Sequence, residues 1–158
     1  MKRIVLFVVL ALVGLTFAGS TVADAQKKMK KEPILWPAAD IKWVDPPSKD
    51  APPGVMVSSL WGDMSKGAYG ALVKFTQVMD TPLHTHSFDV KGVVISGSFW
   101  VAPEGGEKTS FGPGSYMMIP GGWKHTSGNE AGTVLFQEGP GKFDLKPVET
   151  KTDETMKK

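Results

Sequence analysis

Two short segments decide what this chain is: residues 114–129 read GSYMMIPGGWKHTSGN, and residues 81–86 read TPLHTH. Together they contain all three histidines of the chain, His84, His86 and His125. Alternate side chains of a β-strand share a face, so His84 and His86 can offer two imidazoles to one point in space. A third imidazole from a neighbouring strand would complete a metal site with open coordination positions.

Three neutral imidazoles suit zinc, iron, manganese, nickel or copper, and the ligand type does not distinguish among these metals. We therefore expect one divalent transition metal per chain, bound by the three histidines. An H-x-H pair by itself also arises by chance. The alternative interpretation is that the histidines are polar side chains, either on an exposed strand or in a pocket that holds no metal.

The first 25 residues have the organisation of a secretory signal peptide. A basic pair follows Met1, residues 4–18 are almost entirely apolar, and the small-residue sequence Ala-Asp-Ala ends at Ala25. An uncleaved membrane anchor is the alternative, but the apolar run is shorter than the ~18 residues that span a bilayer. We predict cleavage near Ala25 and a periplasmic or secreted protein with no stable membrane insertion.

The composition excludes several classes of function. The chain has no cysteine, which excludes a disulfide framework, thiolate metal ligands and a cysteine nucleophile. The formal net charge of +2 is too small to indicate a nucleic-acid partner. The fold must therefore depend on its hydrophobic core.

The pattern between the termini is typical of an all-β protein. The chain has 18 glycines and 12 prolines at short intervals, and no stretch of about twelve residues keeps a helical apolar period. Short β-rich runs alternate with turns, at residues 41–44, 55–61, 68–78, 90–95, 98–102, 116–119 and 133–137. Many short strands with regularly spaced turns predict a sandwich or a closed barrel.

We divide the chain accordingly into four segments. The signal peptide is followed by a basic and polar linker at residues 26–39, a single β-barrel domain at 40–145, and a charged flexible tail at 146–158. The lysines of the linker could also form a patch for an acidic partner, but a solvated linker is the simpler interpretation.

The second of the two histidine segments matches a known motif. The cupin superfamily has glycine, five residues, proline, one residue, glycine, two residues, histidine, three residues and asparagine. Gly114, Pro120, Gly122, His125 and Asn129 occupy these positions. The chain therefore resembles the cupins, which implies a single-domain jelly-roll β-barrel.

The first cupin motif is matched by His84, His86 and Gly97. The stretches at residues 60–63 and 112–116 further resemble exported, ChrR-like cupins of uncharacterised function. The resemblance implies a metal pocket inside the barrel and leaves the substrate open.

One departure from the first motif concerns a ligand. Many cupins add a carboxylate to the three histidines, but the corresponding position here is Val90, and Asp89 precedes it. A shift of one residue along a strand reverses the side-chain direction, so Asp89 could reach a metal only through a bulge. Its other interpretation is a loop carboxylate that caps the turn after Ser87.

The wall of the pocket should come from large side chains on the inner face of the barrel, with one polar contact from Gln137. The alternative for each large residue is plain core, and Trp123, beside the histidine motif, is the best candidate for the rim. Ser87, Thr85, Ser127 and Asn129 are candidates to hold the second nitrogen of each histidine. The expected wall residues are Trp61, Phe75, Trp100, Met118, Trp123 and Phe136.

Three functions fit these observations. The first is a metal-dependent enzyme, such as a dioxygenase, isomerase or lyase, that acts on a small organic molecule. The second is a metal-dependent binding or sensing module without catalysis, and the third is a structural barrel whose histidines bind nothing. An open jelly roll leaves edge strands, so we also expect a homodimer, with residues 34–44 as an arm that covers an edge.

Overall fold

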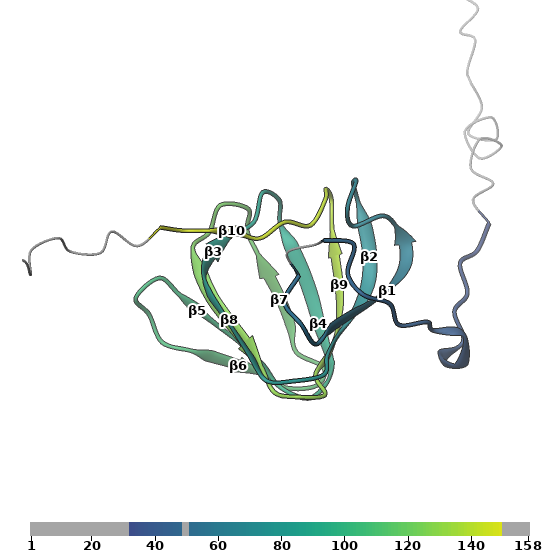
Figure 1. Cartoon of the computed structure of the whole chain (residues 1–158), viewed down its shortest axis with the longest axis horizontal. Helices are drawn as coiled ribbons and strands as arrows, with labels where there is room; N and C mark the ends of the chain where they lie inside the picture. Colours follow the sequence, from purple (N-terminus) through teal and green to yellow (C-terminus); the bar gives the residue numbers. More distant parts are fainter. Residues whose placement is uncertain (1–31, 49–50, 150–158) are drawn as a thin grey trace, which may run out of the picture. The chain divides into compact units, whose positions relative to one another are not determined.

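Two five-stranded antiparallel sheets form the domain (Figure 1). The computed structural model describes residues 32–48 and 51–149. One sheet has the order β1-β2-β9-β4-β7 and the other β10-β3-β8-β5-β6. The strands are β1 (Val55–Gly62), β2 (Tyr69–Phe75), β3 (Met79–Thr85), β4 (Val90–Ser96), β5 (Phe99–Pro103), β6 (Thr109–Phe111), β7 (Tyr116–Ile119), β8 (His125–Asn129), β9 (Val134–Gly139) and β10 (Lys146–Pro147).

The all-β prediction is confirmed, since the one helical element of the described residues is a short 3-10 turn, η1 (Ala38–Asp40). The predicted signal peptide, at residues 1–25, lies outside the described residues. No helix in the described part of the chain is long and apolar enough to cross a membrane.

The strand pairing is of the jelly-roll kind, because strands distant in the sequence lie side by side. β9 lies between β2 and β4, and β8 lies between β3 and β5. The β-rich runs predicted from residue pattern do not include β3, β6 and β8, although the spacing of His84 and His86 and the motif around His125 place these histidines on strands. β3 contains Pro82 and β8 is polar, and neither pattern is typical of a strand.

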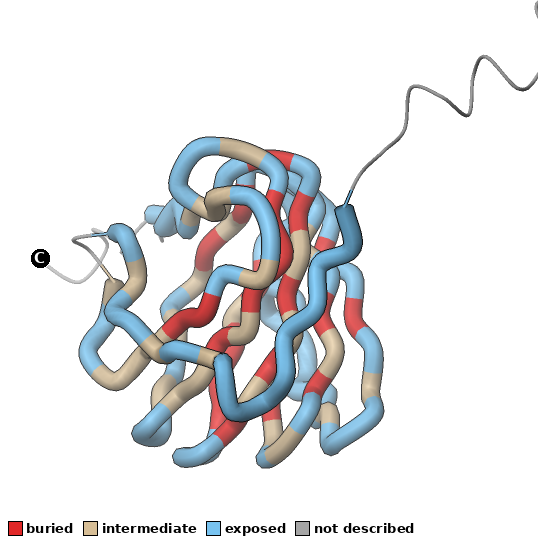
Figure 2. Tube along the Cα trace, turned by 90° about the vertical axis from the view of Figure 1, so that its right-hand side faces the viewer, coloured by how far each residue is buried: buried red, intermediate tan, exposed pale blue. Residues whose placement is uncertain are grey.

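The core lies between the two sheets, where buried positions alternate with exposed ones along the strands (Figure 2). This alternation is the expected consequence of one face of each sheet being covered. Each fully buried aliphatic side chain contributes about 1.5–3 kcal/mol through removal of apolar surface from water. The central cluster consists of Val94, Phe99, Val101, Met117, Ile119 and Leu135.

The backbone conformation and the close packing of a turn explain why position 97, part of the first motif, is glycine. It connects β4 to β5 with φ +76°, a conformation that favours glycine. A Cβ at this position would also lie 2.7 Å from the Cα of Thr133. The turn is held by Thr133, whose hydroxyl donates to the carbonyl of Ser98 over 2.9 Å.

The segment from Ile34 to Val44 lies along β1, the edge strand of its sheet. Val44 forms an isolated antiparallel bridge with Val57, and the indole of Trp36 donates to the carbonyl of Leu60 over 2.9 Å. The predicted strand at residues 41–44 is thus reduced to one bridge. The arm covers an edge of its own chain.

Deletion of residues 26–44 should therefore change the association state of the protein. The truncation removes the bridge to Val57 and leaves the N–H and C=O groups of the β1 edge open to pairing with another chain. We expect larger assemblies in place of the homodimer proposed for the intact protein, measured by light scattering coupled to size exclusion. The matched control is deletion of residues 26–33, which leaves the arm. Equal masses for the two truncations would contradict this role of the arm.

The C-terminal boundary differs from the prediction. Residues 146 and 147, assigned to the charged tail, form β10 and pair with Thr85 and His84 of β3. The amide of Val148 donates to the carbonyl of Leu83 over 2.9 Å. The barrel therefore extends past residue 145, and its last segment lies along the strand that carries the histidine pair.

Candidate metal centre

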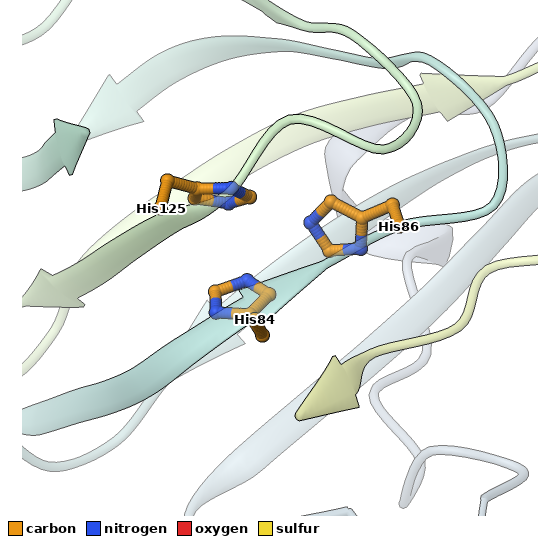
Figure 3. A group of neighbouring side chains, drawn as sticks. All are labelled: His84, His86 and His125. Atoms are coloured by element: carbon orange, nitrogen blue, oxygen red, sulfur yellow. The ribbon is translucent and has the colours of Figure 1, made fainter. Parts of the chain in front are cut away.

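The three histidines converge at one place between the sheets (Figure 3). His84 lies on β3 directly opposite His125, the first residue of β8, and His86 follows the end of β3. One ring nitrogen from each lies within 4.8 Å of the others. The ring centroids of His84 and His125 are 4.1 Å apart, and that of His86 lies 5.0 and 5.2 Å from them. This spacing fits three ligands of one metal ion.

A backbone carbonyl fixes the orientation of each imidazole. The Nδ1 atoms of His84, His86 and His125 lie 2.8, 2.5 and 3.0 Å from the carbonyl oxygens of Pro82, Asp144 and Trp123. A carbonyl oxygen only accepts hydrogen bonds, so each Nδ1 must carry the proton.

The Nε2 atom of each ring therefore keeps its lone pair. None of the described residues donates a hydrogen bond to these atoms. Carbonyl groups that hold the non-ligating nitrogen are the usual outer contacts of metal-binding histidines. The side chains expected in this role (Ser87, Thr85, Ser127 and Asn129) do not perform it. Asn129, for example, donates to the carbonyls of Gln77 and Glu130.

Burial keeps the histidines neutral. His84 is only 2% exposed, His125 1% and His86 6%. Burial lowers the pKa of His84 to about 4, against the smaller opposite effect of its bond to the Pro82 carbonyl. Burial also lowers the pKa of His86 and of His125. All three rings are therefore in the unprotonated form that binds metal at neutral pH.

A C-terminal segment that the sequence analysis missed completes the surroundings of His86. The carbonyl of Asp144 accepts from His86, and its carboxylate accepts from the amide of Ser87 over 2.7 Å and from the Ser87 hydroxyl over 2.5 Å. Burial raises the pKa of Asp144, but the bonds from Ser87 and the charge of Lys146 together outweigh burial and lower the pKa. The ring of Phe143 lies 5.3 Å from that of His86. No local motif in the sequence marks these residues.

Asp89 is exposed, and its carboxylate makes a structural contact close to the histidines. Its Oδ1 accepts a hydrogen bond from the amide of Gly121 over 2.9 Å. This contact joins the start of β4 to the turn that carries His125. Among the described acidic, cysteine and histidine side chains, only the three histidines form a group placed to hold a metal.

Three of the expected wall residues lie on the outer faces of the sheets, which corrects the prediction. The ring of Trp61 lies over Gly70, and the ring of Trp100 lies over Gly128 with the Lys108 ammonium 3.6 Å from its centroid. On β9 the buried positions are Leu135 and Gln137, so Phe136, between them, faces outward. Adjacent strand residues cannot both face inward, so Phe136 and Gln137 could not share the wall.

The other wall candidates lie closer to the interior. Phe75 packs against the core cluster, with its ring centroid 6.1 Å from that of Phe99. Trp123 stacks on His125 with centroids 5.3 Å apart and planes 13° apart. Met118 is the exception, because it is 49% exposed on β7 between the buried Met117 and Ile119 and therefore faces outward. Met118 and Trp123 both line a hollow of about 200 Å³, whose other residues are Val101, Pro103, Thr109, Phe111, Met117 and Ile119. The hollow therefore adjoins the histidines through the ring of Trp123.

Comparison with known proteins agrees with this architecture. A family model described as "Domain of unknown function (DUF4437)" matches residues 24–157. No curated protein matches the chain.

Several solved structures share the fold at low identity. An RmlC-like cupin protein from Ralstonia eutropha JMP134 has a TM-score of 0.58 and 18% identity, over 81% of this chain and 78% of that one. The polyketide cyclase RemF from Streptomyces resistomycificus has a TM-score of 0.54 and 19% identity, over 79% and 89%. KdgF from Halomonas sp. has a TM-score of 0.51 and 24% identity, over 65% and 89%. These similarities show a cupin fold.

Proposed function

The chain belongs to the family described as a domain of unknown function (DUF4437), and we propose that it is a metal-dependent protein that binds and transforms a small organic molecule inside its barrel. The observation that carries the proposal is that the same nitrogen of each of the three imidazoles is bonded to a backbone carbonyl. Each Nδ1 is held by a backbone carbonyl, so three Nε2 lone pairs are left to converge on one ion. The donor set fits a divalent transition metal, because all three ligands are neutral, buried imidazoles.

The charge of the site indicates what kind of molecule it would hold. Three neutral ligands leave both positive charges of the ion uncompensated, and no carboxylate belongs to the group of potential ligands among the described residues. A buried charge requires a partner, so an anionic oxygen ligand is favoured. A bound divalent metal would supply Lewis-acid polarisation of such an oxygen. The histidines themselves would hold the ion at the end of β3 and the start of β8.

A specific observation also supports binding without catalysis. The described residues bury no aspartate, glutamate, lysine or arginine, so the interior offers no ordinary general base. Burial raises the pKa of Tyr69 to about 12, which makes its hydroxyl a weak acid. A metal-dependent binding or sensing module is therefore the second candidate. The name of the RemF structure, a polyketide cyclase, favours the first, since it shows that the fold supports chemistry on a small molecule.

We propose the periplasm or the extracellular space as the location of the protein. The support is the basic start, the apolar run and the Ala-Asp-Ala sequence within residues 1–25. The lack of cysteine means that the fold does not depend on an oxidising compartment.

Metal analysis of protein purified without a histidine tag tests the proposal. We expect about one equivalent of a transition metal per chain, either as isolated or after reconstitution. Oxygen uptake and product analysis with small carboxylates and phenols, on metal-loaded and metal-free protein, then separate an enzyme from a binding module. Less than about a tenth of an equivalent after reconstitution would contradict the proposed metal centre.

A further inference from the structure

Two polar side chains lie together on the inner face of the sheet opposite the histidines, and no part of the metal centre uses them. Tyr69 on β2 is 1% exposed, and Gln137 on β9 is 9% exposed. The amide nitrogen of Gln137 donates to the hydroxyl oxygen of Tyr69 over 2.5 Å. Burial of polar groups is costly without hydrogen bonds, so a pair of this kind in an apolar barrel requires an explanation.

The pair has hydrogen-bonding capacity left over. The Tyr69 oxygen accepts from Gln137, so its own proton must point elsewhere. The Oε1 atom of Gln137 takes part in no hydrogen bond with the described residues. No fully buried side-chain oxygen or nitrogen in the described ranges lacks a partner, so this Oε1 must reach accessible space. One donor and one acceptor are therefore free to meet a molecule inside the barrel.

The pair lies close to the histidines and has room beside it. Tyr69 contacts the ring of Phe143 edge to face at 6.5 Å, and the same ring lies 5.3 Å from that of His86. In the strand register, Gln137 has Ala71 on one side and Gly92 on the other. Ala71 has a single methyl group as its side chain. The Met117 side chain lies 3.5 Å from the position that a Cβ of Gly92 would take, so Ala71 is the neighbour that leaves space beside the Gln137 amide.

The lack of buried charged side chains restricts which ligand groups can bind beside Tyr69 and Gln137. The buried polar side chains among the described residues include no aspartate, glutamate, lysine or arginine. A charged group placed at Tyr69 and Gln137 would therefore have no counter-ion. This part of the interior suits a neutral hydroxyl or carbonyl group, whereas an anionic group belongs at the metal.

We infer that Tyr69 and Gln137 form a polar subsite that binds a neutral hydroxyl or carbonyl group of a small carboxylate, whose anionic end is held at His84, His86 and His125. This inference rests on the proposed metal centre and names its ligand class: a small monoanionic acid with a second, uncharged oxygen group. Gln137 and Tyr69 are positioning residues that select the ligand, and they take no part in holding the metal.

Cobalt-loaded protein and a series of 2-oxo acids of increasing chain length test the inference. Each acid is compared with its analogue that carries a terminal hydroxyl, and the dissociation constants are read from the visible cobalt spectrum. We expect the hydroxyl to tighten binding about tenfold at one chain length, as one well-made hydrogen bond would. In Tyr69→Phe and in Gln137→Leu the two acids should bind equally.

The ratio within each acid pair is the decisive quantity, because a partly unfolded variant weakens both acids alike. Tyr116→Phe is the matched control, since Tyr116 is 59% exposed on β7 and the same atom is removed. It should keep the tenfold preference. A preference that persists in both Tyr69→Phe and Gln137→Leu, or no preference at any length in the unmodified protein, would overturn the inference.

The two proposals fail in different ways. If the protein takes up cobalt but binds none of the acids, the proposed metal centre is supported and the proposed subsite is wrong. If the protein takes up no cobalt, both proposals are wrong.

Discussion

Replacement of His125 by alanine should reduce the metal content from about one equivalent to less than about a tenth. His125 would supply one of the three proposed Nε2 ligands, and in the described part of the chain no carboxylate is placed to replace it. Two neutral imidazoles alone hold a divalent ion far more weakly, because each lost ligand removes a bond that the buried site cannot supply in another way. The measurement is elemental analysis after dialysis against a defined free-metal buffer.

Asp89→Asn is the matched control for that experiment. Its side-chain oxygen can still accept from the amide of Gly121, so the turn before His125 should persist. We expect Asp89→Asn to retain nearly all of the metal. If it lost as much metal as His125→Ala, the carboxylate of Asp89 would have to be a ligand. Thermal unfolding of both variants shows whether each retains the fold.

Metal-free protein should lose stability steeply as the pH falls from about 6.5 to about 4. In the unfolded chain His84 has an ordinary pKa near 6.5. In the folded chain its pKa is about 4, because burial disfavours the charged ring. Between these values the unfolded state binds a proton that the folded state does not. The free energy of unfolding then falls by about 1.4 kcal/mol per pH unit, or about 3 kcal/mol over the window.

The stabilisation from His84 is therefore fully present above pH 6.5 and is lost as the pH falls towards 4. The pKa values of His86 and His125 are also lowered, so their contributions have the same sign. Urea unfolding of chelator-treated protein at pH 7.5 and 4.5 measures the difference, and His84→Gln should make it smaller. Equal unfolding free energies at the two pH values would show that the histidines are not buried in neutral form.

The burial of the three histidines also affects the pH at which the metal is released. From the sequence alone, metal release is expected near the ordinary imidazole pKa of about 6.5. Because burial lowers the pKa of each ring, protons compete with the metal only at lower pH. The metal-bound protein should therefore remain loaded below pH 6.5.

The sequence by itself determined the fold class and indicated that the three histidines form one site. Strand periodicity places His84 and His86 on the same face of a strand. The motif from Gly114 to Asn129 places His125 directly after a turn. These are local properties, in which each residue acts on its near neighbours. For the same reason β8 was missed, because its polar residues become a strand only between β3 and β5.

Only the tertiary structure decided the details of the site. The contact that orients His86 comes from Asp144, 58 residues further along the chain, because β10 pairs with β3. Which face of β9 points inward likewise depends on the pairing of β9 with β2 and β4, and it places Gln137 inside and Phe136 outside. Such long-range pairings follow from the packing of the whole barrel, so no local pattern of residues encodes them.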